Sequence, residues 1–97
     1  MKNYYNYEGT KVYLATGKYP NGRLAVQMFS QDGEPWMTIT VNMPEDIVTN
    51  EKSNYVKTYS ENRGVDHWLI DNNLAHYTGQ INYQIGVPEM EFHLEKF

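Results

Sequence analysis

Apolar and polar residues alternate along the first half of the chain with a period of two, the pattern of β-strands that bury one face. Three such segments lie at residues 11–19, 23–30 and 35–41. They are separated by Pro-Asn-Gly at 20–22 and by Asp-Gly at 32–33, sequences that tolerate the positive φ of a hairpin turn. The pattern therefore predicts a three-stranded antiparallel meander.

The second half of the chain changes its period. Val65, Trp68 and Leu69 follow helical spacing, so a helix of about three turns is predicted within residues 60–75. Because so short a helix is not stable alone, its Trp68 face is expected to lie on a sheet. Residues 76–97 predict one or two closing strands. The expected fold class is α+β, an antiparallel sheet of about five strands with one helix packed on one face.

A chain of 97 residues allows a single domain, residues 1–97, with one modest core. Residues 1–9 are polar and aromatic and are interpreted as an N-terminal arm or a first edge strand. The absence of cysteine excludes disulfides, thiolate catalysis and cysteine-based zinc sites, and it fits a reducing cytoplasm. Apolar runs reach only three residues, whereas a membrane span needs about twenty, so no membrane association is expected.

Charge and aromatic content narrow the class of partner. Twelve acidic and eight basic side chains give a net charge of −4, and the basic residues are scattered. Proteins that bind nucleic acids cluster Lys and Arg, so direct nucleic-acid binding is not expected. Nine Tyr, two Trp and three Phe favour strands and also suit protein-recognition surfaces.

The last ten residues suggest an acidic surface. A regular strand would place Glu89, Glu91, His93 and Glu95 in one row, about 6.6 Å apart, opposite the apolar side chains. Such a row could imitate the phosphates of a DNA strand and occupy a basic channel. The alternative is a solvated face whose charges prevent edge-to-edge association of sheets. The loop acids that would extend the row are Asp32, Glu34, Glu45, Asp46 and Glu51.

Two aromatic residues are candidate contacts for a protein partner. Tyr5 either packs within an edge strand or contacts the partner. Trp36 follows Pro35 and, with strict alternation, shares the less apolar face of its strand with Thr38 and Thr40. The candidate partner-binding residues are therefore Glu89, Glu91, His93, Glu95, Trp36 and Tyr5.

Motifs for catalysis or cofactor binding are missing from the sequence. His67, His76 and His93 lack the H-x-x-x-H spacing of a helical metal site, and a composite site with Asp66 or Glu91 is the less favoured interpretation. No serine lies in a G-x-S-x-G context, and no phosphate-binding loop is present. A protein without enzymatic activity, metal or cofactor is expected.

Three segments carry a resemblance to a known family: "GEPWMTITVN" at 33–42, "KTYSEN" at 57–62, and the pair Thr78-Gly79. With them the chain resembles a small domain family of unknown function that occurs in phages, plasmids and other mobile elements of bacteria. The resemblance covers nearly the whole chain beyond the N-terminal segment. It implies a small accessory protein, and such proteins are often adaptors or inhibitors of host machinery, including anti-CRISPR and other counter-defence factors. It implies no catalytic residue.

The leading hypothesis is a non-catalytic inhibitor from a phage or other mobile element, located in the cytoplasm of the bacterial host. It would bind a defence effector or another basic nucleic-acid-binding protein, and it would block DNA loading through an acidic and aromatic surface. One alternative is an oligomeric sponge or sensor for a small nucleotide-like ligand. Another is a structural accessory protein of a mobile element. The sequence leaves the oligomeric state open.

Overall fold

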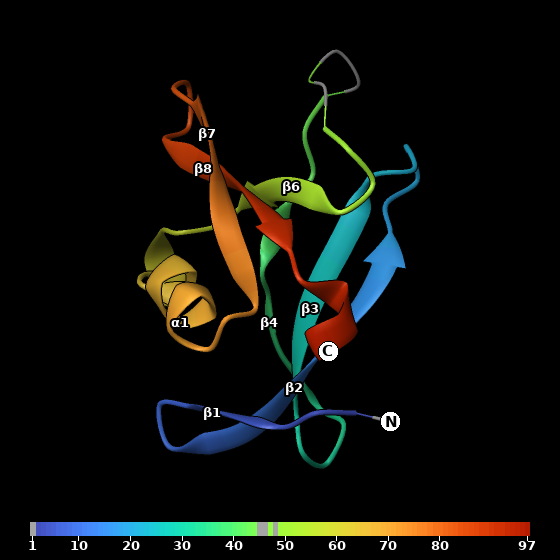
Figure 1. The fold of residues 1–97 in the computed structure, drawn as a ribbon, viewed down its shortest axis with the longest axis vertical. Helices are drawn as coiled ribbons and strands as arrows, with labels where there is room; N and C mark the ends of the chain where they lie inside the picture. The colour runs from blue at the N-terminus through green and yellow to red at the C-terminus, as the bar shows by residue number, and fades with distance from the viewer. Residues whose placement is uncertain (1, 45–46, 48) are drawn as a thin grey trace.

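The computed structural model describes residues 2–44, 47 and 49–97, and within them eight strands form two four-stranded antiparallel sheets (Figure 1). The first sheet has the order β1-β2-β3-β4, from β1 (Tyr5–Tyr7), β2 (Thr10–Lys18), β3 (Leu24–Ser30) and β4 (Pro35–Thr38). The second has the order β5-β6-β8-β7, from β5 (Thr40–Val41), β6 (Ser53–Val56), β7 (Ala75–Asn82) and β8 (Val87–Phe92). One α-helix, α1 (Val65–Asp71), and two 3-10 turns, Ser60–Asn62 and Leu94–Lys96, complete the described elements.

The predicted meander is present as β2, β3 and β4. Its two turns are closed by backbone hydrogen bonds, from Gly22 to Tyr19 and from Gly33 to Ser30, each 2.8 Å long. Both glycines have φ near +90°, at +85° and +87°, a conformation that residues with a Cβ rarely adopt. The α+β class is confirmed, but the expected single sheet of about five strands is instead two sheets of four.

The chain passes from the first sheet to the second at Ile39, between β4 and β5. The amide of Ile39 donates to the carbonyl of Val26 in β3, and its own carbonyl accepts from the amide of Lys57, which follows β6. Ile39 is fully buried, so one residue belongs to the hydrogen-bond network of both sheets. The strand predicted at 35–41 is therefore divided between the sheets.

Thr40, just after this switch, lies inside the protein rather than on an exposed face with Trp36. Its hydroxyl is 2.8 Å from the Tyr19 hydroxyl and accepts a hydrogen bond of 3.1 Å from the Val26 amide. Strict alternation through residues 35–41 was the wrong expectation, because the chain turns between two sheets within that segment.

Side chains from both sheets and from α1 meet in the main core. The largest fully buried ones include Met28, Ile39, Leu69, Met90 and Phe92. A second, smaller cluster of Met43, Tyr55 and Val87 is separate from it. Burying one such large apolar side chain stabilises the fold by roughly 1.5–3 kcal/mol.

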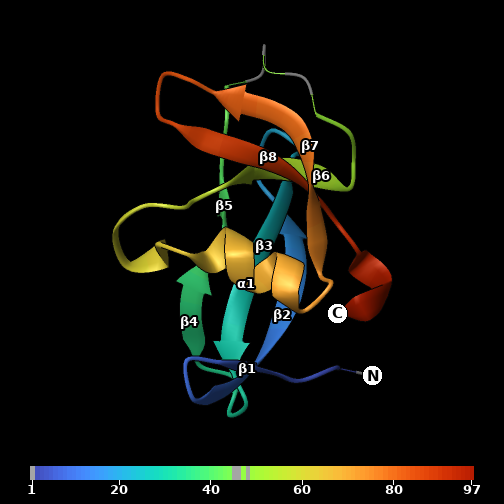
Figure 2. The same ribbon diagram turned by 60° about the vertical axis from the view of Figure 1, so that its left-hand side comes forward.

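The short helix α1 lies beside the lower half of β7, which it contacts (Figures 1 and 2). Trp68 packs edge-on against Tyr5 and Tyr7, with ring centroids 6.4 and 5.2 Å apart, and its indole nitrogen donates to the Asn6 carbonyl at 2.7 Å. The helix thus joins the second half of the chain to β1. No helix among the described residues has the length and apolar character needed to cross a membrane.

Candidate functional site

The acidic row predicted for the closing segment is not formed. β8 ends at Phe92, and Leu94–Lys96 form a 3-10 turn, so the strand does not extend far enough to carry the row. Glu89 has only 7% of its surface exposed, and its carboxylate accepts a hydrogen bond of 2.6 Å from the Thr78 hydroxyl. Glu95 is exposed but lies on the 3-10 turn. Glu45 and Asp46, which would extend the row, lie outside the described residues.

Glu89 is buried because the face of β8 opposite the main core is also covered. Val87 and Glu89 alternate onto this face, where Val87 packs with Tyr55 of β6 in the smaller apolar cluster. Burial and the neighbouring Glu89 carboxylate raise the pKa of Tyr55. Glu91 is half-buried, and the Asn50 side-chain amide donates to its carboxylate at 3.4 Å. The alternation of residues predicted the face of β8 to which these glutamates point. It did not predict that other residues cover that face.

His93 follows β8 directly and contacts His76 of β7. Nδ1 of His76 lies 2.8 Å from Nε2 of His93, and Nδ1 of His93 lies 2.8 Å from the Asn73 carbonyl oxygen. Because a carbonyl only accepts, neutral His93 carries its proton on Nδ1 and receives a hydrogen bond from His76. Within residues 2–44, 47 and 49–97, no three His, Cys, Asp or Glu side chains converge as metal ligands.

Tyr5 is half-buried and is engaged within the protein. Its ring packs on Trp68, and its hydroxyl donates to the Lys96 carbonyl at 2.7 Å. The Asn3 amide donates to the carbonyl of Phe97 nearby, at 3.1 Å. Tyr5 therefore ties the edge strand β1 to the C-terminal turn.

Trp36 is the predicted contact residue whose large apolar side chain stays open to solvent, with 47% of its surface exposed. The pairing of β3 with β4 matches Met28 to Met37 but Phe29 to Pro35, which leaves Trp36 as an extra residue in β4. Such a β-bulge turns a side chain away from regular alternation. The exposure of Trp36 is thus built into the backbone.

Two acids precede Trp36 in the turn between β3 and β4. Asp32 and Glu34 are exposed, and the ion pairs seen among the described residues, Lys57–Glu61 and His67–Asp66, involve neither of them. We call Asp32, Glu34 and Trp36 the acidic-aromatic edge. The sequence contains one indication of this acidic surface that the alternation of residues does not reveal. Residues 24–51 contain no Lys, Arg or His.

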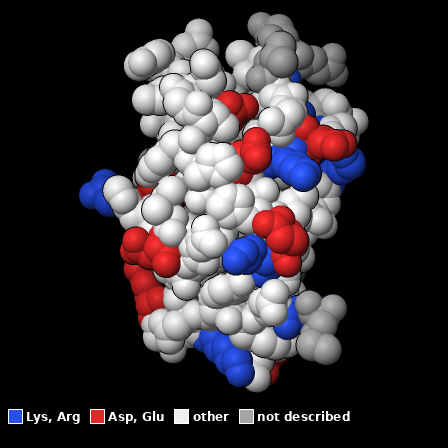
Figure 3. Space-filling view, in the orientation of Figure 1, with Lys and Arg blue, Asp and Glu red and all other residues white. Residues whose placement is uncertain are grey.

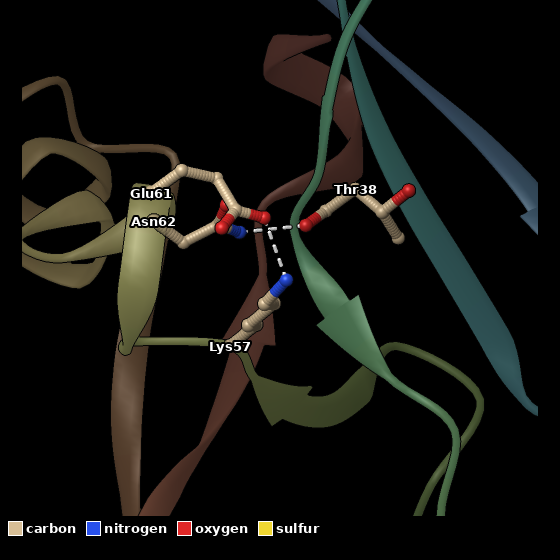
Figure 4. Close-up of polar contacts among 4 residues, drawn as sticks. All are labelled: Thr38, Lys57, Glu61 and Asn62. Atoms are coloured by element: carbon tan, nitrogen blue, oxygen red, sulfur yellow. Dashed lines mark hydrogen bonds and ion pairs between the residues drawn. The ribbon is translucent and has the colours of Figure 1, made fainter.

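The segment 57–62 supports this edge from the side (Figure 4). The side-chain amide of the buried Asn62 donates to the Thr38 carbonyl of β4 at 2.7 Å. On the surface, Lys57 and Glu61 form an ion pair of 2.7 Å, and the hydrogen bond from Lys57 lowers the pKa of Glu61 below its usual range. Two of the segments that carried the family resemblance, 33–42 and 57–62, are therefore in contact.

A second exposed surface lies at the far end of the second sheet, where β7 turns into β8. Tyr83 is 87% exposed, and Ile81 and Ile85 on either side of it are 46% and 48% exposed. Residues 72–88 contain no Asp, Glu, Lys or Arg, and this end of the molecule is free of charged side chains in Figure 3 (upper left). We call Ile81, Tyr83 and Ile85 the uncharged hairpin.

Residues 13–96 match a protein family described as "Domain of unknown function (DUF4313)", and the chain belongs to this family. No curated protein and no solved structure matches the chain significantly. The matched region includes the acidic-aromatic edge and the uncharged hairpin but begins after β1, so Tyr5 lies outside it.

Proposed function

We propose that the protein is a non-catalytic binding protein whose acidic-aromatic edge docks on a basic surface of a partner protein. The observation that carries this proposal is the position of Trp36, turned outward by a β-bulge next to Asp32 and Glu34, which form no ion pair among the described residues. Exposed tryptophans are frequent anchors of protein interfaces, and one anchor can account for about 2 kcal/mol or more of the binding free energy.

Charge complementarity favours a basic partner. Asp32 and Glu34 lie in a part of the sequence without basic residues. On the adjoining strand β2, the Nζ atom of Lys11 lies over the ring of Tyr4, 5.1 Å from its centroid. Acidic side chains around an aromatic anchor accelerate encounter with a positively charged surface and disfavour an acidic one. A cleft that binds nucleic acid is a basic surface of this kind.

The resemblance to proteins of mobile elements narrows the partner to a bacterial defence effector or another nucleic-acid-handling protein. The protein would act as an inhibitor of the anti-CRISPR type, and occupation of the cleft would block DNA loading. In this proposal the acidic contribution comes from Asp32 and Glu34, because Glu89 is buried and bonded to Thr78.

The alternative of a nucleotide sponge has less support. A pocket of about 360 Å³ is lined by Asn21, Arg23 and Thr49 among others. The Arg23 guanidinium, the group that would hold a phosphate there, already donates to Thr49 Oγ1 at 3.0 Å and to the carbonyls of Pro44 and Ile47. These donors are therefore already engaged by Pro44, Ile47 and Thr49.

The test is a binding assay between the purified protein and a panel of purified CRISPR and restriction effectors, each with and without its DNA. We expect a complex with at least one effector in competition with DNA, and Trp36→Ala should weaken it about 30-fold or more. Tyr83→Ser, which removes an exposed aromatic residue elsewhere on the surface, should bind like the wild type. Binding to no effector, or equal binding by Trp36→Ala, would refute the proposal.

A further inference from the structure

The second half of β2 is an open edge of the first sheet. β2 pairs with β3 from Val12 to Lys18, but its pairing with β1 on the other side stops at Val12. No strand of the described residues continues beside residues 13–18 on that side. The register of β2 with β3 runs through this segment without a shift. A regular stretch about 20 Å long is therefore paired on one side only.

The other sheet edges of the described structure are protected in ways that this one is not. β1 and β5 have only three and two residues. β4 carries a β-bulge and Pro35, and the pairing of β7 with β8 shifts register between Tyr77 and Ile81. Short edges, bulges and prolines keep sheet edges from pairing with other chains. Residues 13–18 contain no proline and no bulge, and their one charged residue, Lys18, stands at the end.

The hydrogen-bond pattern shows which backbone groups face the open side. The Gln31 amide donates to the Lys11 carbonyl at 2.9 Å, across from β2. Because alternate residues of an antiparallel strand bond to the same neighbour, the odd-numbered residues of β2 bond to β3. Leu14, Thr16 and Lys18 therefore direct their N–H and C=O groups to the open side. Within the described part of the chain, no backbone hydrogen bond occupies these groups.

A groove runs along this edge, between β2 and the two ends of the chain. One pocket of about 590 Å³ is bounded by residues 13–16, Lys2, Leu94 and Phe97. A second pocket, of about 390 Å³, shares Thr16 and Leu94 with the first, so the two are continuous. The C-terminal turn lies beside β2 in Figures 1 and 2. The open backbone groups thus face a space that is partly lined by apolar side chains.

The charge of the groove favours an acidic occupant. Lys2 stands at one end, with its Nζ atom 4.3 Å from the ring centroid of Tyr13. Lys18 and Lys52 line the other pocket, and Glu51 is the one acid among the described residues that line either pocket. Three lysines and one acid make this groove locally basic on a chain whose net charge is −4. Acidic groups are therefore attracted to it.

The open backbone groups favour a polypeptide. A row of phosphates accepts hydrogen bonds but donates none to the carbonyls of Leu14, Thr16 and Lys18. An extended peptide presents N–H and C=O groups at the spacing of the sheet and satisfies both kinds of group. Side chains of such a peptide alternate, so those on one face can contact Leu94 and Phe97.

We propose that this groove is a docking site for an extended acidic segment of a partner protein, which adds to β2 as a further strand. Acidic side chains of the segment lie near Lys2 at one end and near Lys18 and Lys52 at the other. β3 separates this site from the acidic-aromatic edge on β4. The inference does not rest on the function proposed for that edge.

The test begins with a phage-displayed library of random linear decapeptides, selected against the purified protein. The selected peptides are expected to carry acidic residues on either side of alternating apolar ones, and their synthetic copies should bind in isothermal titration calorimetry. Binding should slow hydrogen exchange of the Leu14, Thr16 and Lys18 amides at least about tenfold, measured by NMR, because new ladder bonds protect them. A library that yields no binder, or binders that leave these amides unprotected, would overturn the inference.

Thr16→Pro distinguishes strand addition from other modes of peptide binding. Proline removes the outward N–H of Thr16 without removing a bond to β3, and edge positions tolerate it. The selected peptides should bind this variant at least about tenfold more weakly, because a ladder bond is lost and the ring obstructs pairing. Thr16→Val keeps the N–H and is the matched control, which should bind within about twofold of the wild type.

Lys18→Glu and Lys52→Glu test the charge of the groove. Each should weaken peptide binding about three- to tenfold at low salt and less at high salt. The control, Arg63→Glu, makes the same charge change at an exposed position just before α1 and should bind normally. Circular dichroism checks that every variant is folded. Peptide affinity unchanged by both lysine variants would overturn the inference.

Two further measurements separate this site from its alternatives. Light scattering detects a second copy as the occupant: a dimer that Thr16→Pro dissociates, with no peptide selected, would overturn the inference. Trp36→Ala should bind the selected peptides like the wild type. The docking groove and the acidic-aromatic edge therefore fail separately.

Discussion

The acidic-aromatic edge and the uncharged hairpin each expose one large aromatic side chain, Trp36 at 47% and Tyr83 at 87%, but they differ in the charge around it. Trp36 stands beside Asp32 and Glu34, whereas Tyr83 lies within a segment that has no charged residue. An exposed aromatic side chain therefore does not by itself define a partner. The surrounding charge does, because acids repel another copy of an acidic chain and attract a basic surface.

The two surfaces also differ in how the fold holds them. The acidic-aromatic edge is supported by the hydrogen bond from Asn62 to Thr38. The strands of the hairpin are held by bonds from Thr78 to Glu89 and from Tyr77 to Asp66, and by the main core through β8. Substitutions that remove these hydrogen bonds should therefore change the stability of the fold, whereas substitutions of the exposed side chains should change binding.

The largest effect is expected from Phe92→Ala, which should destabilise the main core beneath both surfaces. Phe92 is 1% exposed and packs edge-on against Phe97. The cavity should lower the free energy of unfolding by about 3–5 kcal/mol, measured by urea denaturation. Trp36→Ala and Tyr83→Ser should each change it by less than about 0.5 kcal/mol. A loss below about 1 kcal/mol for Phe92→Ala would contradict this account of the core.

Thr78→Val should have the next largest effect and would act on the hairpin side alone. It removes the hydroxyl that bonds the buried Glu89 carboxylate, and an unsatisfied buried group costs about 1–3 kcal/mol. Urea denaturation measures the loss, and Thr78→Ser, which keeps the hydroxyl, is the control. Glu89→Gln in the Thr78→Val background should recover part of the stability. Equal stability of the Val and Ser variants would show that this bond does not support the strand pair.

Neutralising the acids of the acidic-aromatic edge should have a smaller effect, on the rate of association with a partner. The double variant Asp32→Asn, Glu34→Gln should slow association with a basic effector by about three- to tenfold at low salt, and the difference should shrink as salt rises. Stopped-flow association rates at several ionic strengths measure this. The control removes two acids elsewhere, Glu8 and Glu95, as glutamines. If the control slows association as much, net charge rather than the position of Asp32 and Glu34 is responsible.

The smallest predicted effect is a pH dependence of stability, which involves the hydrogen bond from Tyr77 of β7 to Asp66 of α1. Burial, followed by the hydrogen bond to Asp66, raises the pKa of Tyr77 to about 12 from 10.0. Below pH 10 this tyrosine is neutral in the folded and the unfolded chain, and between pH 10 and 12 the unfolded chain loses its proton first. The free energy of unfolding should therefore fall more steeply over that range for the wild type than for Tyr77→Phe.

Because Tyr77 is partly exposed, solvent screening keeps this difference small. Urea midpoints at pH 9, 10 and 11 for the two proteins measure it. The other tyrosines with raised pKa, Tyr7 and Tyr55, are present in both proteins and do not affect the comparison. Parallel pH profiles would mean that neither the burial of Tyr77 nor its contact with Asp66 contributes to the pH dependence of stability.

Local sequence rules predicted the elements whose causes are local. Asn21-Gly22 and Asp32-Gly33 carry the turn chemistry of the meander, and Val65, Trp68 and Leu69 carry the helical spacing of α1. The division into two sheets was missed because Ile39 reads as an ordinary strand residue. Only its two partners, Val26 and Lys57, which come from different sheets, reveal the switch.

The candidate site was harder to predict because burial depends on contacts distant in sequence. Glu89 was expected on a solvent face, and the cover over that face comes from residues around Tyr55, far along the chain. The pairing of His76 with His93 follows from the register of β7 and β8, which matches His76 to Glu91. The charge-free stretch 72–88 was readable from composition alone, but its exposure was not.

The two tryptophans lie in different surroundings, which gives the protein its own optical reporters. Trp36 is about half exposed to water, while the Trp68 ring packs against Tyr5 and Tyr7 and its indole nitrogen donates to the Asn6 carbonyl. Water relaxes around an excited indole and shifts its fluorescence to longer wavelength, so the two residues contribute emission of different colour. Docking at Trp36 should shift the red component alone, and loss of α1 should shift the blue one. One spectrum can therefore distinguish complex formation from denaturation without an added dye.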